Sequence, residues 1–387
     1  MRLCKRPFPK PVIVSMVSLV GITLYLICNP TFTFNWKSSY GLPLIHRPYG
    51  YGTITMYLKD SGTFKAVDKL KSDTNSYKDK FTTVSTNAST NGCFQSFWEL
   101  NFGVKTTLNA ERKEVNYTGI PRNCNRYVML DLLPGRTGNI MFQFAALIGL
   151  AKRYDLIPLV KDHLTIGQWF ELPIFPRVEM IDSMELKSPV CCVYDDVFEH
   201  INGFNNWTIS GYFQSWKYFS HVKQIIEQMF TLKEVFTKNA IAFLNETRSP
   251  GQWTVCIHVR RGDMLMPSAS MRGYRVAGID FINRAMEYYR TGLLNVLFVM
   301  VSDGILWCRE NIRGENITFS PFYSNLDDFA LMTSCDHVVV TSGTFGWWGA
   351  WLSRGTTVYF KDYPGSGSWL ASQTNREDYY PRHWVAI

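Results

Sequence analysis

The chain has 387 residues, of which 46% are apolar and 15% aromatic, and its formal net charge is +8. This length and composition suit a folded protein of about two domains with a substantial core. A positive net charge is compatible with a nucleic acid, an anionic membrane surface or an anionic small substrate as partner. Because no long block of Lys and Arg follows the scattered amino-terminal cations, we expect no nucleic-acid partner.

The amino-terminal segment has the pattern of a membrane anchor. Four cations come first: Arg2, Lys5, Arg6 and Lys10. Residues 12–28 then read VIVSMVSLVGITLYLIC, just long enough for a membrane-spanning helix of about 17 to 20 residues. A cleaved signal peptide is the alternative, but the stretch ends without a small-x-small cleavage pattern. Since cations favour the cytosolic side, we predict a cytosolic tail over 1–10, a signal-anchor helix over 11–29 and a lumenal remainder, as in a type II protein of the thin Golgi membrane.

Two kinds of residue bear on a lumenal location. Five N-x-S/T triplets predict glycosylation at Asn87, Asn116, Asn206, Asn245 and Asn316. Seven cysteines lie beyond the apolar stretch: Cys93, Cys124, Cys191, Cys192, Cys256, Cys308 and Cys335. An oxidising lumen permits disulfides, but an odd number leaves at least one thiol free, and Cys256 in an apolar strand pattern is the expected buried thiol. No cysteine spacing resembles a zinc site, so we expect no structural metal.

The middle of the chain changes texture near Arg126. Residues 30–123 are rich in Thr, Ser, Asn, Lys and Gly with little periodicity, which is typical of a stem. RYVMLDLL then predicts a strand, PGRTGN a turn, IMFQFAALIGLAKRY a helix and LIPLV a second strand. TISGYF predicts another strand, and amphipathic helices run through Lys238 to Thr247. These elements predict an amino-terminal catalytic half over 124–250.

The last third alternates strands and helices more regularly. Strands are predicted at WTVCIHV, NVLFVMV, NITFSP, DHVVVTS and TTVYF, and helices at GIDFINRAMEYYRTG, ILWCREN, NLDDFALMTSC and TFGWWGAWLSRG. This alternation predicts a parallel sheet wound on both sides, forming a carboxyl-terminal half over 251–387. Ligands of such sheets bind beyond the carboxyl ends of the strands, so we expect 258–263, 302–304 and 341–345 to be neighbours in one cleft.

The segment HVRRGD, from His258 to Asp263, ends the first of these strands. Side chains alternate along a strand, so His258 and Arg260 should share one face while Arg261 takes the other. A planar guanidinium matches phosphate oxygens two at a time, and a fixed Arg stabilises the charge that grows on a departing phosphate. A surface ion pair between Arg261 and Asp263 is the alternative. An adhesive Arg-Gly-Asp tripeptide is a weaker one, because it belongs on an exposed loop tip.

Two further turns join strands to helices. In TSGTFG, residues 341–346, small residues let the backbone approach a phosphate, and the helix start offers free N–H groups. Ser342 or Thr344 as a plain helix cap is the alternative, and the following WWGAW is expected in the core. The turn GRTGN, residues 135–139, lacks both the P-loop Lys-Ser/Thr and the dinucleotide fingerprint. No Asp-x-Asp triplet and no G-x-S-x-G elbow occur, which disfavours a metal-bound nucleotide sugar and a covalent hydrolase.

Together these segments resemble the animal-type alpha-1,2-fucosyltransferase family. GRTGNIMFQFAAL resembles the family's G-R-x-G-N-Q-M-x-Q-x-A, with Ile140 in place of Gln, and GYFQSWKYF, HVRRGD, the segment from DDFALMTSC to TTVYF and the closing HWVAI follow in the family's order. The resemblance runs from about Leu133 to Ile387. It implies a GT-B-like α/β fold of two Rossmann-like halves. It also implies an inverting, metal-independent transfer of L-fucose from GDP-fucose, the donor substrate, to a glycan hydroxyl, such as O2 of a terminal galactose, with no cofactor.

The resemblance also implies site residues. Arg260 would hold the diphosphate with His258 and the turn Ser342, Gly343, Thr344 and Phe345; the strand-end rule adds Arg261, Ser302 and Asp303. Arg136 and Asn139 would face the reacting centre from the amino-terminal half. Asp263 is the nearest acid in sequence for a general base, although it follows the arginines expected to hold the phosphates. Two alternatives stay open: a non-catalytic lumenal binder of glycans or nucleotide sugars on the same fold, and a fucosyltransferase of another linkage or with a protein acceptor.

Overall fold

The structure is a computed structural model, and most of its described residues lie from Arg126 onward. Side chains are described for 97–98, 101–102, 126–160, 166–173, 175 and 182–387. Secondary structure alone is given for 164–165 and for β1 (Val12–Val17), β2 (Thr23–Cys28), β3 (Thr33–Asn35), β4 (Thr53–Leu58) and β5 (Phe64–Ala66). The chain divides into two compact units, Met1–Asp79 and Lys80–Ile387, and the second carries both predicted catalytic halves.

The predicted anchor over 11–29 is not confirmed. The only structure given there is β1 paired with β2 in antiparallel register, and the rest of the segment lies outside the described residues. Among the described helices, none combines the length and the apolar character that a membrane crossing requires. The anchor therefore stays a prediction from the sequence.

The amino-terminal half is built on a four-stranded parallel sheet. Its order is β7 (Ile157–Val160), β6 (Tyr127–Leu130), β9 (Trp207–Ser210) and β8 (Met184–Lys187). The long helix α2 (Thr137–Arg153) buries an almost unbroken run from Met141 to Ala151 against this sheet and its surroundings. The strands predicted at both ends of α2 and at TISGYF are confirmed. The helix, however, begins at Thr137, within the turn expected to precede it.

The carboxyl-terminal half is a six-stranded, wholly parallel sheet. Its order is β12 (Ile317–Phe319), β11 (Val296–Ser302), β10 (Trp253–Val259), β13 (His337–Val340), β14 (Thr357–Tyr359) and β15 (Val385–Ala386). The connecting helices are α7 (Ile279–Gly292), α8 (Ile305–Asn311), α9 (Asn325–Ser334) and α10 (Thr344–Ser353). All nine predicted elements of this half are present, so the predicted α/β class with parallel sheets is confirmed.

Shorter elements complete the described chain. These are α3 (Leu164–Gly167), η1 (Asp196–His200), η2 (Trp216–Tyr218), η3 (Ser220–Val222), α4 (Lys223–Met229), α5 (Glu234–Thr247), η4 (Gly262–Leu265), α6 (Pro267–Arg272), α11 (Trp369–Ser372) and α12 (Arg376–Tyr379). Helix α5 precedes the predicted boundary at 250/251 yet packs on the carboxyl-terminal half. Its Asn239 amide donates to Asp327 of α9 at 3.2 Å.

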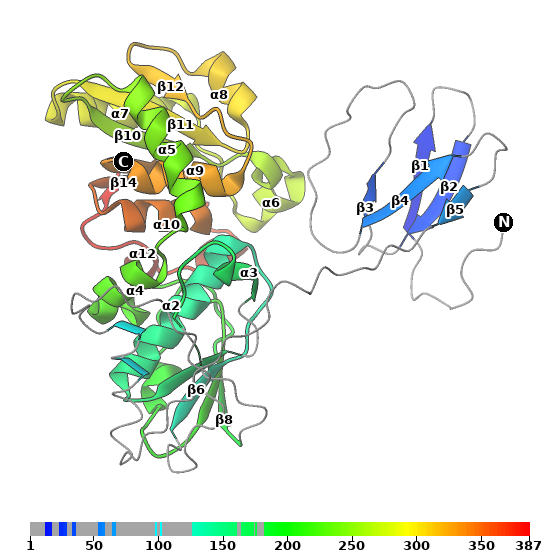
Figure 1. Ribbon diagram of the computed structural model, residues 1–387, viewed down its shortest axis with the longest axis vertical. Helices are drawn as coiled ribbons and strands as arrows, with labels where there is room; N and C mark the ends of the chain where they lie inside the picture. Colours follow the sequence, from blue (N-terminus) through cyan, green and yellow to red (C-terminus); the bar gives the residue numbers. More distant parts are fainter. Residues whose placement is uncertain are drawn as a thin grey trace. The chain divides into compact units, whose positions relative to one another are not determined.

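The two halves meet along α10, which lies between the carboxyl-terminal sheet and α2 in Figure 1. Phe142 of α2 packs on Trp347 and Trp348, with ring centroids 4.5 and 5.0 Å apart. The Trp348 indole also donates to the Gly138 carbonyl at 3.1 Å. Both tryptophans are fully buried, which confirms that WWGAW belongs to the core.

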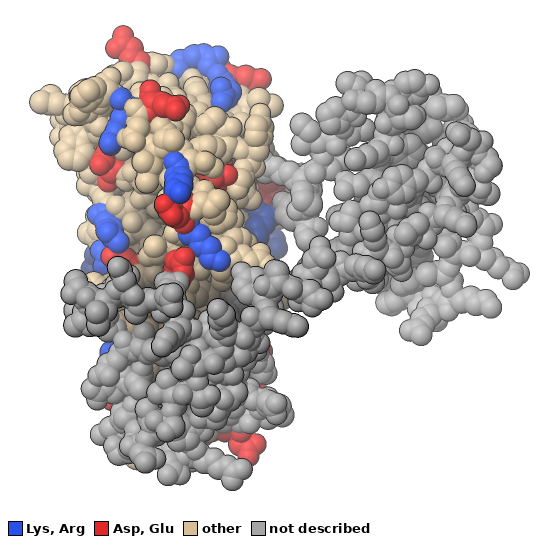
Figure 2. Space-filling view, in the orientation of Figure 1, with Lys and Arg blue, Asp and Glu red and all other residues tan. Residues whose placement is uncertain are grey.

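The structure also describes surface charges, cysteines and three of the five N-x-S/T asparagines. On the face seen in Figure 2, basic and acidic side chains are interspersed over the carboxyl-terminal half. The described cysteines, 191, 192, 256, 308 and 335, form no disulfide, and Cys256 is fully buried as predicted. Asn245 and Asn316 are exposed, whereas the Asn206 side chain accepts from the Tyr127 N–H and donates to the Asp182 carbonyl. Asn87, Asn116, Cys93 and Cys124 lie outside the described residues.

Candidate functional site

The carboxyl ends of three adjacent strands, β11, β10 and β13, meet as the strand-end rule predicts. The Arg260 N–H donates to Thr341 Oγ1 at 2.9 Å, which joins the end of β10 to that of β13. The Arg261 N–H donates to Asp303 Oδ1 at 2.8 Å, and the Ser302 hydroxyl donates to the Val259 carbonyl at 2.6 Å. The structure thus brings together all three predicted segments of this half.

Arg260 is the most enclosed cation of this cluster, with a side chain that is 16% exposed. Its guanidinium pairs with two carboxylates, those of Asp303 and Asp263. Arg261 turns the other way and lies over the Trp307 ring of α8, 3.6 Å from its centroid. The alternative of a surface ion pair between Arg261 and Asp263 is therefore not found among the described residues: strand alternation sends Arg261 towards α8, and Asp263 pairs with Arg260 instead.

Asp263 also reaches the amino-terminal half. Its Oδ2 lies 3.0 Å from Arg136 Nη2, across 127 residues of sequence. Both side chains are about half exposed. One carboxylate thus connects the guanidinium of the HVRRGD segment with that of the GRTGN turn, the two segments expected to face each other across the reacting centre.

Asn139 joins the halves beside this ion pair. Its Oδ1 accepts from the Thr344 hydroxyl at 2.9 Å and from the Gln214 amide at 3.2 Å. Gly138 makes the approach possible, because a Cβ there would lie 2.6 Å from the Thr344 carbonyl carbon. Sequence reasoning missed Gln214, although it lies in the GYFQSWKYF segment that carried part of the resemblance.

Helix α10 presents its amino terminus to the same place. Gly343, with φ +83°, leads into the helix, and none of the described side chains caps it. Ser342 is buried and donates to the Met264 sulfur at 3.2 Å, and the Thr344 hydroxyl donates to Asn139, so the alternative of either residue as a plain cap is not found in the described part of the chain. Backbone N–H groups that no side chain caps at the start of a helix form a ready anion site.

His258 lies behind this turn and is almost fully buried. Burial, and then the charge of Arg260, lower its pKa from 6.5 to about 3, so the imidazole is neutral at physiological pH. Its Nδ1 has no hydrogen-bond partner among the described residues, and a Cβ on Gly346 would come within 2.3 Å of it. Phe345 packs at a tilt against both this ring and Phe329. His258 is therefore part of a closely packed wall behind the turn.

The chemical capability follows from these charges. Arg260 and the first turn of α10 offer donors from neighbouring elements, as stabilisation of an anionic leaving group requires, and His258 packs behind them. The nearby carboxylates of Asp263 and Asp303 are both engaged with Arg260. Within the described residues, no three His, Cys, Asp or Glu side chains gather as metal ligands. The arrangement is suited to holding a phosphate ester by cations and backbone N–H groups.

Known proteins are similar to this chain over the same region. The profile described as Glycosyl transferase family 11 matches residues 92–387. Galactoside alpha-(1,2)-fucosyltransferase 2 of Gorilla gorilla gorilla is 33% identical over 248 residues, covering 59% of this chain and 70% of the relative. Galactoside alpha-(1,2)-fucosyltransferase 1 of Leontocebus fuscicollis is 30% identical over 277 residues, covering 65% and 73%.

Among solved structures, a NodZ alpha-1,6-fucosyltransferase soaked with GDP-fucose superposes with a TM-score of 0.45 at 13% identity, covering 62% of this chain and 97% of that one. A likeness this low carries no conclusion about chemistry. The profile match, in contrast, includes both halves and every residue of the site described above. The chain belongs to glycosyl transferase family 11.

Proposed function

We propose that this chain is an inverting alpha-1,2-fucosyltransferase that moves L-fucose from GDP-fucose to O2 of a terminal galactose on a glycan. Family membership and the names of the relatives support the reaction class and the linkage. The observation that carries the proposal is the position of Arg260, enclosed where the strand ends meet and beside the uncapped start of α10. The proposal includes a GT-B-like arrangement of the two halves.

The reaction needs charge stabilisation on one side of the sugar and a nucleophile on the other. The bond between fucose C1 and the β-phosphate oxygen breaks, and its electron pair stays on that oxygen. Arg260 and the first turn of α10 hold this developing charge, and His258 completes the wall. The acceptor hydroxyl attacks C1 from the opposite face, which inverts the configuration, and its proton passes to a base or to water. Asp263 and Asp303 orient the Arg260 guanidinium before the donor arrives.

We propose that no metal ion takes part. The supporting observations are that the sequence has no Asp-x-Asp triplet and that the carboxylates nearest the proposed phosphate position, Asp263 and Asp303, already pair with Arg260. Arg and a helix terminus can supply the positive charge that a divalent cation gives other nucleotide-sugar enzymes. Turnover in excess EDTA should equal turnover without chelator, and full loss that added Mg²⁺ or Mn²⁺ restores would contradict this part of the proposal.

We also propose a type II location in the Golgi membrane, anchored by residues 11–29 and held off the bilayer by a stem within the predicted range 30–123. The end of that range belongs to the catalytic part, because Phe97 and Trp98 are buried in its hydrophobic core. The apolar stretch after amino-terminal cations supports the orientation. Alkaline carbonate should leave the full chain in the membrane pellet, and protease added to intact vesicles should spare the region beyond residue 29. Release into the carbonate supernatant would contradict the anchor.

The transfer itself is tested with a glycan array and GDP-fucose, read by mass spectrometry and linkage analysis. We expect one added deoxyhexose on galactose-terminated glycans, linked to O2. Replacing the central cation, in Arg260→Ala, should strongly reduce this transfer. Arg284→Ala is its matched control, because Arg284 is exposed on α7 outside the site. GDP-fucose binding without transfer to any glycan would favour a non-catalytic binder, and a product linked through another oxygen would contradict the alpha-1,2 assignment.

A further inference from the structure

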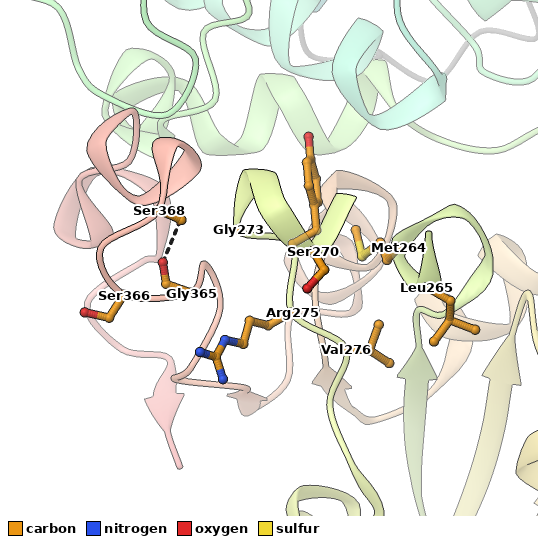
Figure 3. Close-up of a pocket in the computed structure, with 10 residues that line it drawn as sticks. Met264, Leu265, Ser270, Gly273, Arg275, Val276, Gly365, Ser366 and Ser368 are labelled. Atoms are coloured by element: carbon orange, nitrogen blue, oxygen red, sulfur yellow. Dashed lines mark hydrogen bonds between the residues drawn. The ribbon is translucent and has the colours of Figure 1, made fainter. Parts of the chain in front are cut away.

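A cavity of about 530 Å³ lies in the carboxyl-terminal half, next to the site. One wall is the segment after β10 that includes α6, and the other is the segment after β14 (Figure 3). The residues that line it include Met264, Ser270, Tyr274, Arg275, Ser366 and Ser368. Sites for small molecules are typically about 300–1,000 Å³, so the cavity has room for a sugar unit or two.

The two walls are packed against each other rather than merely adjacent. The Gly365 N–H donates to the Gly273 carbonyl at 2.8 Å. A Cβ on Gly273 would lie 1.9 Å from Ser368 Oγ, and a Cβ on Gly365 would lie 2.9 Å from Arg275 Nε. Two glycines therefore set the spacing of the walls and with it the shape of the cavity.

The cavity is lined by hydroxyl groups and one cation. Ser270, Tyr274 and Ser366 carry hydroxyls, whereas none of the described residues that line it carries a carboxylate. Arg275 is exposed, reaches towards the segment that carries Gly365 and Ser366 (Figure 3), and has no hydrogen-bond or ion-pair partner among the described residues. A guanidinium is the preferred partner of a planar or tetrahedral oxyanion, which it binds through two parallel hydrogen bonds.

The cavity borders the proposed transfer site. Met264, which lines it, accepts a hydrogen bond from Ser342 at 3.2 Å and follows directly after Asp263. Trp369 follows the lining residue Ser368 in the chain and is 53% exposed, and the Arg272 guanidinium lies 5.1 Å from its ring centroid. A half-exposed indole offers the apolar face on which a sugar ring packs, while its neighbours supply polar contacts. Through Met264 the cavity therefore adjoins the proposed transfer site.

We propose that this cavity is an acceptor subsite that binds a sugar unit bearing an acidic group, a carboxylate or a sulfate ester, and that Arg275 pairs with that group. The inference rests on the proposed function, because it assigns the ligand as the acceptor. It places a determinant of acceptor choice in the carboxyl-terminal half, beyond the donor residues.

The test compares matched oligosaccharides that end in the same galactose and differ at one neighbouring unit: neutral, uronic acid, or sulfated. We expect wild-type kcat/KM to be higher for at least one acidic form, and Arg275→Ala to reduce that preference by about tenfold or more, as the loss of a hydrogen bond to a charged group does. The two acidic forms distinguish a carboxylate from a sulfate. Arg284→Ala should leave the preference unchanged, and Arg275→Lys should retain part of it.

A binding measurement separates this inference from the proposed reaction. Saturation-transfer NMR with the acidic oligosaccharide should show contact in the wild type and its loss in Arg275→Ala, with the GDP affinity equal in both by calorimetry. Such a result without any turnover supports the subsite and counts against the transferase alone. Equal binding of the neutral and acidic forms, an unchanged preference in Arg275→Ala, or weaker GDP binding in that variant would each overturn the inference. Thermal unfolding checks that the variants are folded.

Discussion

The two halves of the catalytic unit contribute to the site in different ways. The carboxyl-terminal half uses long, buried strands: β10 and β11 each have seven residues, and three neighbouring strand ends supply His258, Arg260, Asp303 and the 341–345 turn. The amino-terminal half has strands of only four residues and supplies Gln214 and one turn, which is docked on α10 through Gly138 and Asn139. The donor side is thus fixed by the sheet itself, whereas the opposite side depends on a contact between the halves.

Removing the central cation of the donor side should have the largest effect. Arg260→Ala should lower kcat by about a thousandfold or more, because the charge on the departing diphosphate loses its closest donor. Arg260→Lys should recover only part of the rate, since an ammonium cannot make the planar two-point contact. Rates are measured as GDP release, with circular dichroism to confirm folding. A folded Arg260→Ala enzyme at wild-type rate would exclude the assigned role.

Separating the halves should have the next largest effect. In Gly138→Ala the new Cβ would lie 2.6 and 2.8 Å from backbone atoms of Thr344 and Phe345, which cannot move without displacing α10. Overpacking of this kind typically costs about 1–3 kcal/mol of stability, and we expect kcat to fall as well, because Asn139 leaves Thr344.

The matched control for this substitution is Gly278→Ala, where a Cβ would meet nothing within 4 Å. Denaturant unfolding and initial rates are compared for both variants. If Gly138→Ala matches Gly278→Ala in both measurements, the close approach of the halves does not matter for activity.

The same difference between the halves explains how far the sequence was predictive. Strands buried on both faces appear as continuous apolar runs, so WTVCIHV predicted β10 with the same ends and NVLFVMV predicted β11 to within one residue at each end. The strand MELK, β8, is mostly exposed and has no apolar run, so it was missed. The start of α2 was misplaced because the contact of Gly138 with α10 is tertiary.

The site was predictable for a similar reason, and only in part. The strand-end rule brings His258, Asp303 and Thr341 together without any knowledge of packing. Arg275 and Ser366 come from irregular segments separated by about 90 positions, and they meet only because Gly273 and Gly365 pack closely. Periodicity in the sequence does not predict that these two residues line one cavity.

The buried histidine of the donor side should make stability depend on pH. His258 has a pKa of about 3 in the folded chain, against an ordinary value of 6.5, so between these values the unfolded chain binds more protons. Stability should therefore fall as the pH drops from about 6.5 towards 3, by at most about 1.4 kcal/mol per pH unit from this one group. The other histidines with lowered pKa, His221, His337 and His383, act in the same direction.

The contribution of His258 is isolated by comparing the wild type with His258→Asn. Urea unfolding at several pH values between about 7 and 4.5 should show a shallower slope in the variant. Equal slopes would mean that His258 is protonated in the folded chain, contrary to its burial beside Arg260.

The exposed ion pair between the halves should matter least for stability. Arg136 and Asp263 lie 3.0 Å apart and are each about half exposed, so water screens their attraction. A double-mutant cycle with Arg136→Gln and Asp263→Asn should give a coupling of about 0.2–1 kcal/mol at low salt, fading as ionic strength rises. A coupling several times larger that persists in about 1 M salt would show that the halves are held by charge as well as by the packing of α2 on α10.

Activity can respond differently, because the same pair orients Asp263 towards Arg260, so kcat is measured for each variant of the cycle. A large loss of rate with a small coupling in stability would place Asp263 among the groups that position the donor-side arginine.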